Sequence, residues 1–237
     1  SHKVNHCAIK KIKEALYHPL DAKLVLRELK ISRLIGNHPN ILGIRDLIRP
    51  SSKRRMDTIY IVSDFMDTDL YRLCQSQVEF TENHVRHLLY QMLCGLSYMH
   101  SANILHRDMK TANLLVDRNF NLQICDFGLA RFSSPGHEYD CEGSTGSVPE
   151  ADGGTPPLTE LVVTLWYRAP ELVANSHYNS SIDLWAVGCI FAEMLLRRPL
   201  FPGRDHLHQL QLITDIMGTP TETDIRTIRG AYARKVL

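Results

Sequence analysis

Two short polar motifs lie close together in the middle of the chain, and their residue types suit one reaction. The first reads His-Arg-Asp-Met-Lys-Thr-Ala-Asn over residues 106–113, and the second reads Asp-Phe-Gly over residues 126–128. Moving a phosphoryl group to a hydroxyl needs a carboxylate to accept the proton, a cation beside the moving group and oxygen ligands for Mg²⁺. The motifs supply side chains of all these types: Asp108, Lys110, Asn113 and Asp126.

Further short motifs stand before and after this pair. A lone His-Arg-Asp tripeptide would be a weak signal, but here it belongs to a series. The other members are Cys7-Ala8-Ile9-Lys10, Arg27-Glu28-Leu29, Ala169-Pro170-Glu171 and Asp183-Leu184-Trp185. From residue 4 to about residue 220 the chain therefore resembles a eukaryotic Ser/Thr protein kinase. The resemblance implies an α+β fold of two lobes, with a small strand-rich N-lobe and a larger helical C-lobe.

The hydrophobic pattern agrees with such a division of the chain. With 237 residues, 44% of them hydrophobic, the chain can form one large domain or two small lobes. Short apolar or β-branched runs at residues 4–12, 41–48 and 58–63 predict strands, and residues 24–34 have helical spacing. The expected parts of one kinase domain are a partial N-lobe with the hinge (1–66), a C-lobe (67–237) and, within it, an activation segment (126–171).

Three helices are expected in the C-lobe. Apolar residues recur at steps of three and four along residues 81–99, which begin with a threonine suited to the N-cap position. Residues 184–196 are nearly all apolar, which is typical of a helix buried at the centre of a domain. Residues 204–217 predict the third helix, and Gly218 followed by Pro220 should end it.

Charge and composition argue against several other classes of protein. Twenty-seven basic and 26 acidic residues leave a formal charge of +1, so no broad basic field favours nucleic acid. No apolar run approaches the roughly 18 to 20 residues that a membrane span requires. The six cysteines include no Cys-x-x-Cys pair, which disfavours a disulfide framework or a zinc site. We therefore expect a cytoplasmic or nuclear protein with neither nucleic acid nor membrane as partner.

By resemblance, each residue of the two central motifs has a distinct role. Asp108 would accept the proton of the substrate hydroxyl, and Lys110 would screen the charge of the γ-phosphoryl group. Asn113 and Asp126 offer the hard oxygen atoms that suit Mg²⁺. Asp183 would hold the backbone of the catalytic loop from a central helix. The expected cofactors are ATP and Mg²⁺.

The nucleotide itself is expected to bind between the lobes. Lys10 would hold the α and β phosphates of ATP, and Glu28 would pair with that lysine. Ala8 and Leu115 would form the roof and floor for the adenine. Cys125, which precedes the metal-binding aspartate, is better interpreted as a small buried hydrophobic residue than as a reactive thiol.

Residues 59–72 resemble the hinge of mitogen-activated protein kinases. The backbone at Asp64 and Met66 would bond the adenine edge, and Asp69 would lie near the ribose. Ser63 falls at the gatekeeper position, where most relatives carry a larger residue. This small residue predicts an unusually deep back pocket, which bulky C3-substituted purine mimics should occupy.

The activation segment suggests control by a single phosphate. Thr159 lies eleven residues before Pro170, where this family carries its activating phosphate. Three arginines match those that relatives fold around that phosphate: Arg27, Arg107 and Arg131. An upstream activating kinase is therefore an expected partner. The tyrosine of the Thr-x-Tyr pair of mitogen-activated kinases is replaced by Leu161.

In this respect the segment resembles cyclin-dependent kinases, whose motif is reproduced at residues 162–171. Residues 27–31, however, lack the cyclin-binding signature, and the hinge favours a mitogen-activated kinase. Both groups phosphorylate Ser or Thr followed by proline, so such proteins are the expected substrates. A positive φ is expected at Val163, where a strained backbone would favour that proline.

Several departures from the family pattern leave alternatives open. The chain starts inside the third strand, without a Gly-rich loop, and stops soon after the third helix, so we interpret it as truncated at both ends. A catalytically impaired scaffold and a cyclin-dependent kinase are the alternative functions. Ser32 replaces an apolar residue that helps to stack the lobes, and Thr111 replaces a proline of the catalytic loop.

Overall fold

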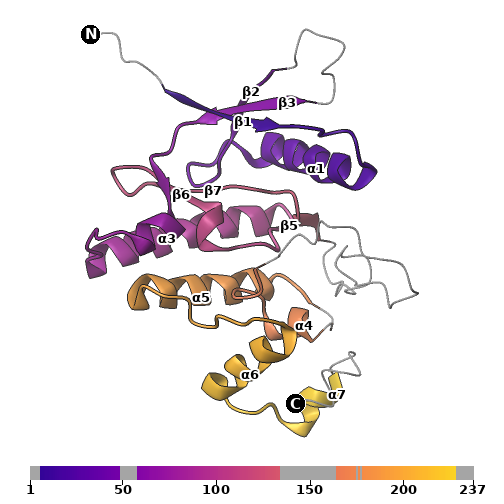
Figure 1. Ribbon diagram of the computed structural model, residues 1–237, viewed down its shortest axis with the longest axis vertical. Helices are drawn as coiled ribbons and strands as arrows, with labels where there is room; N and C mark the ends of the chain where they lie inside the picture. Colours follow the sequence, from indigo (N-terminus) through magenta and orange to yellow (C-terminus); the bar gives the residue numbers. More distant parts are fainter. Residues whose placement is uncertain (1–5, 49–57, 134–163, 175, 177, 228–237) are drawn as a thin grey trace.

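The computed structural model describes residues 6–48, 58–133, 164–174, 176 and 178–227. A small antiparallel sheet with one helix forms the upper part of the molecule in Figure 1, and helices dominate the lower part. The expected α+β fold, with a strand-rich N-lobe and a helical C-lobe, is therefore confirmed. None of the helices described is both long and apolar enough to cross a lipid bilayer.

The N-lobe sheet is antiparallel and has the strand order β1-β3-β2. Its strands are β1 (Cys7–Ile12), β2 (Ile44–Ile48) and β3 (Ile59–Asp64). The register places Ala8 opposite Ser63 and Lys10 opposite Ile61. Because side chains alternate between the faces of a strand, Ala8 and Lys10 lie on the same face of this sheet.

Two N-lobe elements have bounds that differ from the expected ones. Helix α1 (Pro19–Ile35) starts earlier than residue 24, because a proline in its first turn has a suitable φ and needs no hydrogen-bond partner. The strand expected at residues 41–48 begins only at Ile44. The buried Ile41 instead forms a parallel bridge with Ile124, and so it joins the N-lobe to the C-lobe.

Several very short elements lie at the junction of the lobes. They are β4 (Thr68–Asp69), α2 (Leu70–Gln75), β5 (Ile104–Leu105), the 3₁₀ helix η2 (Thr111–Asn113), β6 (Leu114–Val116), β7 (Leu122–Ile124) and β8 (Arg131–Phe132). One small sheet has the order β4-β6-β7, and β5 pairs with β8. Since β6 pairs with β7, the residues just before β6 and just after β7 are neighbours. Both central motifs therefore meet at this hairpin.

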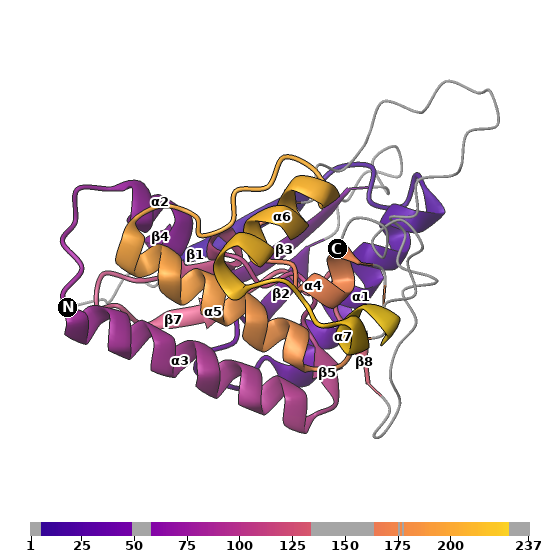
Figure 2. The same ribbon diagram turned by 90° about the horizontal axis from the view of Figure 1, so that it is seen from below.

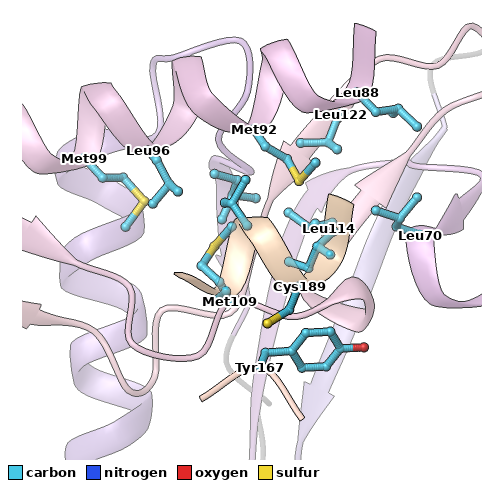
Figure 3. Close-up of a cluster of buried hydrophobic side chains, with 14 of the residues drawn as sticks. Leu70, Leu88, Met92, Leu96, Met99, Met109, Leu114, Leu122, Tyr167 and Cys189 are labelled. Carbon is cyan, nitrogen blue, oxygen red and sulfur yellow. The ribbon is translucent and has the colours of Figure 1, made fainter. Parts of the chain in front are cut away.

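Helix α3 (Glu82–Ser101) confirms the helix expected from the apolar spacing. Thr81 caps its N-terminus: its hydroxyl accepts from His84 N–H at 3.3 Å, and the His84 ring accepts from Thr81 N–H at 3.4 Å. One face of the helix points into the main core, as Figure 3 shows for Leu88, Met92 and Met99. Burial of this apolar face stabilises the C-lobe.

Helix α5 (Ser181–Leu196) lies between α3 and the pair formed by α4 (Pro170–Val173) and α6 (His206–Met217), as Figures 1 and 2 show. The buried helix expected at residues 184–196 lies within α5, but only part of its apolar surface is buried. Ala186, Val187 and Ile190 are buried, but Leu184, Phe191, Leu195 and Leu196 are exposed. Hydropathy alone could not show this, because it does not tell which faces of a helix have neighbours.

The C-terminal part of the described chain follows the expected stop signals. Helix α6 begins after Asp205, whose carboxylate accepts from His208 N–H at 2.9 Å. It ends at Gly218, which has φ = 90°, a conformation that favours glycine. The short helix α7 (Glu222–Thr227) follows.

Candidate active site

The catalytic loop at residues 106–113 is held from below by one buried carboxylate on α5. Asp183 Oδ2 accepts from His106 N–H at 2.9 Å, and Asp183 Oδ1 accepts from Arg107 N–H at 2.8 Å. The ring of His100, at the end of α3, lies 2.9 Å from Asp183 Oδ2. The side chain of Asp183 is only 1% exposed, so these bonds replace water entirely. The structural role expected of Asp183 agrees with this geometry.

Arg107 and His106 shape the loop further. Arg107 has φ = 67°, a strained conformation for a residue that is not glycine, and Asp183 holds its N–H there. His106 Nδ1 accepts from Asp108 N–H at 3.2 Å, so the proton of its neutral ring is on Nε2, 3.1 Å from Cys125 O. His106 thus links the loop to the residue before the Asp-Phe-Gly motif. Sequence reasoning assigned no role to His100 or His106, although His106 is part of a motif.

Asp108 lies where its carboxylate is fixed from two sides. Asp108 Oδ2 accepts from Lys110 Nζ at 2.7 Å and from Asn113 Nδ2 at 3.1 Å. Asn113 Nδ2 also donates to Asp108 O at 2.8 Å. The structure therefore brings together all three residues that the sequence predicts to be catalytic. The bonds restrict the Asp108 side chain to one orientation, as a proton acceptor requires.

The two expected Mg²⁺ ligands lie at the same end of the β6–β7 hairpin. Asn113 precedes β6, and its carbonyl accepts from Cys125 N–H at 3.0 Å, which places Asp126 next in line. Within the part of the chain that the structure describes, the Asn113 side chain donates both of its hydrogen bonds through Nδ2, so its Oδ1 oxygen can face a cation. No cluster of three or more His, Cys, Asp or Glu side chains suited to a metal occurs among the described residues. This donor set fits Mg²⁺, which typically takes one or two protein oxygens and completes its shell with phosphates and water.

Lys10 and Glu28 form the ion pair that the sequence predicts, between β1 and α1. Lys10 Nζ lies 2.7 Å from Glu28 Oε1. Burial works to lower the pKa of Lys10, but Glu28 and then Asp126 outweigh it, so the pKa is raised. Lys10 is therefore a cation at neutral pH, and it faces the aspartate of the C-lobe motif. The pair joins the N-lobe to the candidate metal site.

The surroundings of Cys125 show that these groups converge. Burial raises the pKa of the Cys125 thiol to about 12; Asp126, Glu28 and Asp69 add to the effect, whereas Lys10 opposes it. The Cys125 thiol is thus affected by charges that come from β1, α1, β4 and the Asp-Phe-Gly motif. A thiol with such a pKa stays protonated at neutral pH, which favours the interpretation of Cys125 as a structural residue.

The residues expected around the adenine lie at the junction of the lobes. Ala8 and Leu115 are half-buried, on β1 and β6 respectively. The Asp64 side chain pairs with Arg45, the Asp64 carbonyl accepts from the Ser63 hydroxyl at 3.4 Å, and Met66 is half-buried. Asp69 pairs with Leu115 across β4 and β6 and caps α2 by accepting from Arg72 N–H at 2.8 Å. The predicted contact with the ribose would use the same Asp69 carboxylate that caps α2.

Ser63 occupies the expected position next to this junction. It pairs with Ala8 and Ile44 on either side, and its hydroxyl contacts Asp64 O at 3.4 Å. A small side chain there is consistent with a deep back pocket, which stays a prediction.

The three arginines expected to receive a phosphate lie close together. Arg27 Nη1 donates to Gly128 O at 2.7 Å, and Arg131 Nη1 donates to Ala130 O at 3.1 Å. Burial first, and then the charges of Arg27 and Arg107, lower the pKa of Arg131 to about 10. Three mutually repelling cations favour a bound anion. Thr159, the proposed phosphate carrier, and Val163 lie outside the described residues.

A surface hollow opens between Asp108 and the segment before α4. Its lining includes Asp108, Met109, Thr164, Tyr167 and Arg168. The hollow is also lined by Ile182, Asp183 and Ala186 of α5, so it reaches beneath the catalytic loop.

Comparison with known proteins agrees with this geometry. The family model described as "Protein kinase domain" matches residues 1–230. "Mitogen-activated protein kinase 5" of Oryza sativa subsp. indica is 48% identical over 231 residues, which are 97% of this chain and 57% of that protein. "Mitogen-activated protein kinase 3" of Arabidopsis thaliana gives the same identity and coverage.

The Arabidopsis thaliana protein "Mitogen-activated protein kinase 5" is 47% identical over 229 residues, which are 96% of this chain and 56% of that protein. The chain thus spans somewhat more than half the length of these curated relatives. Because the family match covers nearly all of the chain and the motif residues meet at one site, the chain belongs to the protein kinase domain family and is similar to plant mitogen-activated protein kinases.

Proposed function

We propose that this chain is the catalytic part of a Ser/Thr protein kinase that transfers the γ-phosphoryl group of ATP to a protein hydroxyl. The observation that carries the proposal is the convergence at Asp108: Lys110 and Asn113 fix its carboxylate, and Asp126 follows the strand paired with the one after Asn113. A proton acceptor, a cation and two side chains suited to Mg²⁺ at one point are typical of an active site rather than of a purely structural loop.

The residues would divide the reaction as follows. Asp108 accepts the proton of the substrate hydroxyl as its oxygen attacks the γ-phosphorus, and Lys110 neutralises charge on the transferred group. Lys10, held by Glu28, orients the phosphates. Asn113 and Asp126 would hold Mg²⁺, which supplies neutralisation of the phosphate oxygens. The bond from γ-phosphorus to the bridging oxygen breaks, so ADP leaves and a phosphoester remains on the substrate.

The substrate class that we propose is Ser or Thr followed by proline. The support is the resemblance of residues 162–171 to kinases with that preference, together with the similarity to mitogen-activated kinases. The specificity is testable with paired peptides that differ only in the residue after the acceptor.

Transfer of ³²P from γ-labelled MgATP to a Ser-Pro peptide and its Ser-Ala counterpart tests both parts of this proposal. We expect transfer to the first peptide, at least about tenfold weaker transfer to the second, and a loss of roughly 10² to 10⁴ in kcat for Asp108→Asn. Asp117→Asn is the matched control, because that carboxylate only bonds its own turn.

MgATP that shifts the thermal unfolding of the chain without any transfer would favour the kinase-like scaffold instead. Equal rates on the two peptides would contradict the proline preference while leaving the kinase proposal intact. Co-purification of a cyclin would favour the cyclin-dependent alternative.

We also propose that an upstream kinase activates the protein by phosphorylating Thr159. The support is the cluster of Arg27, Arg107 and Arg131, whose like charges lie close enough to act on one another. Thr159→Val should abolish activation by the upstream kinase, whereas Thr155→Val, in the same segment, should not. Activation that survives Thr159→Val would contradict this assignment.

A further inference from the structure

Three buried oxygen-bearing side chains from distant parts of the sequence form a closed ring below the catalytic loop. Tyr167 OH donates to Glu193 Oε2 at 2.7 Å, and the Thr111 hydroxyl lies 2.9 Å from Tyr167 OH and 3.4 Å from Glu193 Oε1. Thr111 belongs to η2, Tyr167 to the segment before α4, and Glu193 to α5. We refer to these three residues as the Thr111 ring.

The ring is sealed from solvent. Thr111 is 1% exposed, Glu193 is fully buried and Tyr167 is 7% exposed. Figure 3 shows the Tyr167 ring directly beside Cys189, at the edge of the main core. Buried polar groups of this kind need each other as hydrogen-bond partners, because water cannot replace a lost contact.

The number of hydrogens indicates how the ring is closed. With an ionised carboxylate, the two hydroxyls supply two hydrogens for three oxygen–oxygen contacts; a protonated carboxylate supplies the third. Burial raises the pKa of Glu193, although the bonds from Tyr167 and Thr111 lower it in part. The protonated form of Glu193 is the one that supplies a hydrogen for each of the three contacts.

The other titratable groups near the ring do not offer Glu193 a positive charge. Cys74 on α2 and Cys189 on α5 are buried thiols whose pKa values are raised to about 12, chiefly by burial. Arg197 lies near Cys74, but its guanidinium donates to backbone carbonyls of α2 and the following turn, among them Leu73 O and Ser76 O. The groups that act on the pKa of Glu193 among the described residues are thus the hydroxyls of Tyr167 and Thr111, and no cation is among them.

Thr111 has a particular place in the chain. It lies between Lys110, which bonds Asp108, and Asn113, which bonds the same carboxylate. At the other side of the ring, Tyr167 lines the hollow that opens toward Asp108. A proline, which the family pattern has at position 111, would offer no hydroxyl to this ring.

We propose that Thr111 is a positioning residue, whose hydroxyl closes the ring with Tyr167 and Glu193 and so holds the catalytic loop in register with the segment before α4, where we expect the peptide to bind. This inference rests on the proposed kinase function for its kinetic consequence, but the ring itself can be tested without any activity. A purely apolar role for Thr111, through its methyl group, is the alternative that the test must exclude.

The first test is a double-mutant cycle in the thermal unfolding of the full chain. Thr111→Val and Tyr167→Phe each remove one hydroxyl and keep the shape of the side chain, so each should lower Tm by about 2 to 4 °C. The double variant should lose clearly less than the sum, because either change opens the same ring. Thr214→Val is the matched control, since that exposed hydroxyl bonds only Gln211 O of its own helix.

The second test is kinetic and uses a Ser-Pro peptide with MgATP. Thr111→Val should raise the KM for the peptide roughly three- to tenfold and leave the KM for ATP unchanged, because the Lys10–Glu28 pair does not touch the ring. Thr111→Ser, which retains the hydroxyl, should restore the peptide KM. Glu193→Gln keeps one donor and one acceptor in the ring, so it should be milder than Glu193→Ala.

The outcomes separate the two proposals. Additive Tm losses in the cycle, or a Thr111→Val variant as stable as Thr214→Val, would overturn the ring whether or not the chain has activity. A peptide KM that Thr111→Val leaves unchanged would overturn the positioning role. A coupled ring in a chain without phosphoryl transfer would instead count against the kinase function and leave the ring standing.

Discussion

The catalytic loop and the Lys10–Glu28 pair both face the expected nucleotide, but the protein holds them in different ways. Asp183, 1% exposed, fixes the loop through two backbone N–H groups, whereas Lys10 is 53% exposed and its charge is held by one carboxylate. Buried hydrogen bonds are costly to break, while exposed ion pairs contribute little to stability. The catalytic loop of the C-lobe is thus fixed before the substrate binds. The Lys10–Glu28 pair, which we call the N-lobe clamp, can change its position more easily.

The largest effect should come from the anchor of the loop. Asp183→Asn replaces one acceptor oxygen by an NH₂ group that faces backbone donors, so we expect unfolding to become easier by about 2 to 4 kcal/mol, together with loss of phosphoryl transfer. Denaturant titration measures the first and a peptide assay the second. Asp67→Asn is the control, because that exposed carboxylate also accepts a backbone N–H, from Arg118 at 3.0 Å. If Asp183→Asn and Asp67→Asn lose the same unfolding free energy, burial does not make the Asp183 hydrogen bonds stronger contributors, and the comparison fails.

The N-lobe clamp should give the opposite pattern. Lys10→Met should lower kcat/KM at least about tenfold through the loss of phosphate contacts, while Tm changes by no more than about 1 °C. Lys11→Met, the neighbouring lysine over the Tyr60 ring, should leave both values nearly unchanged. A Tm loss for Lys10→Met as large as that for Asp183→Asn would erase the difference between the regions.

The pH dependence of this clamp has a defined sign. Because the pKa of Lys10 is raised above its ordinary value of 10.5, its contribution to stability is complete below that value and is lost only as pH rises through the folded-state pKa. Wild type and Lys10→Met should therefore have parallel Tm profiles from pH 6 to about 9. A gap between the profiles that opens within this range would contradict the assignment.

A smaller effect is expected where α5 meets α2. The Arg197 guanidinium donates to carbonyls of Leu73, Cys74, Ser76 and Val78 and lies 4.5 Å from the centre of the Phe80 ring. A lysine cannot reproduce this planar fork, so Arg197→Lys should cost about 1 to 2 kcal/mol of unfolding free energy. Arg198→Lys, at an exposed position next to it, should cost less than about 0.5 kcal/mol.

The smallest effect concerns the packing between the lobes. Ser32 on α1 is 4% exposed, and Ile31 and Ile35 of the same helix are buried as well. Ser32→Leu should raise Tm by about 1 to 3 °C and also raise the transfer rate, because added apolar contact would tighten the clamp against the C-lobe. Arg33→Leu, on the exposed face of α1, should not. A lower Tm for Ser32→Leu would show that the site has no room.

The sequence alone identified the motif residues and much of the fold. The motifs were predictable because their residues lie at short spacings, which can be read directly from the sequence. They include Asp108, Lys110, Asn113 and Asp126. The helix after Thr81 was predictable for the same reason, since its apolar period and its N-cap are both local. The exposed face of α5 was not predictable, because its exposure depends on neighbours that hydropathy does not describe.

Only the tertiary structure decided how these residues are held. The sequence shows that Glu193 interrupts an apolar helix, but not that it meets Thr111, 82 residues earlier, and Tyr167, 26 residues earlier. Likewise, the His-Arg-Asp motif identifies Arg107 in the sequence. Its strained backbone, which Asp183 holds, is seen only in the structure. Long-range contacts arise from how elements pack, and a residue's identity limits what it can bond without fixing which partner it meets.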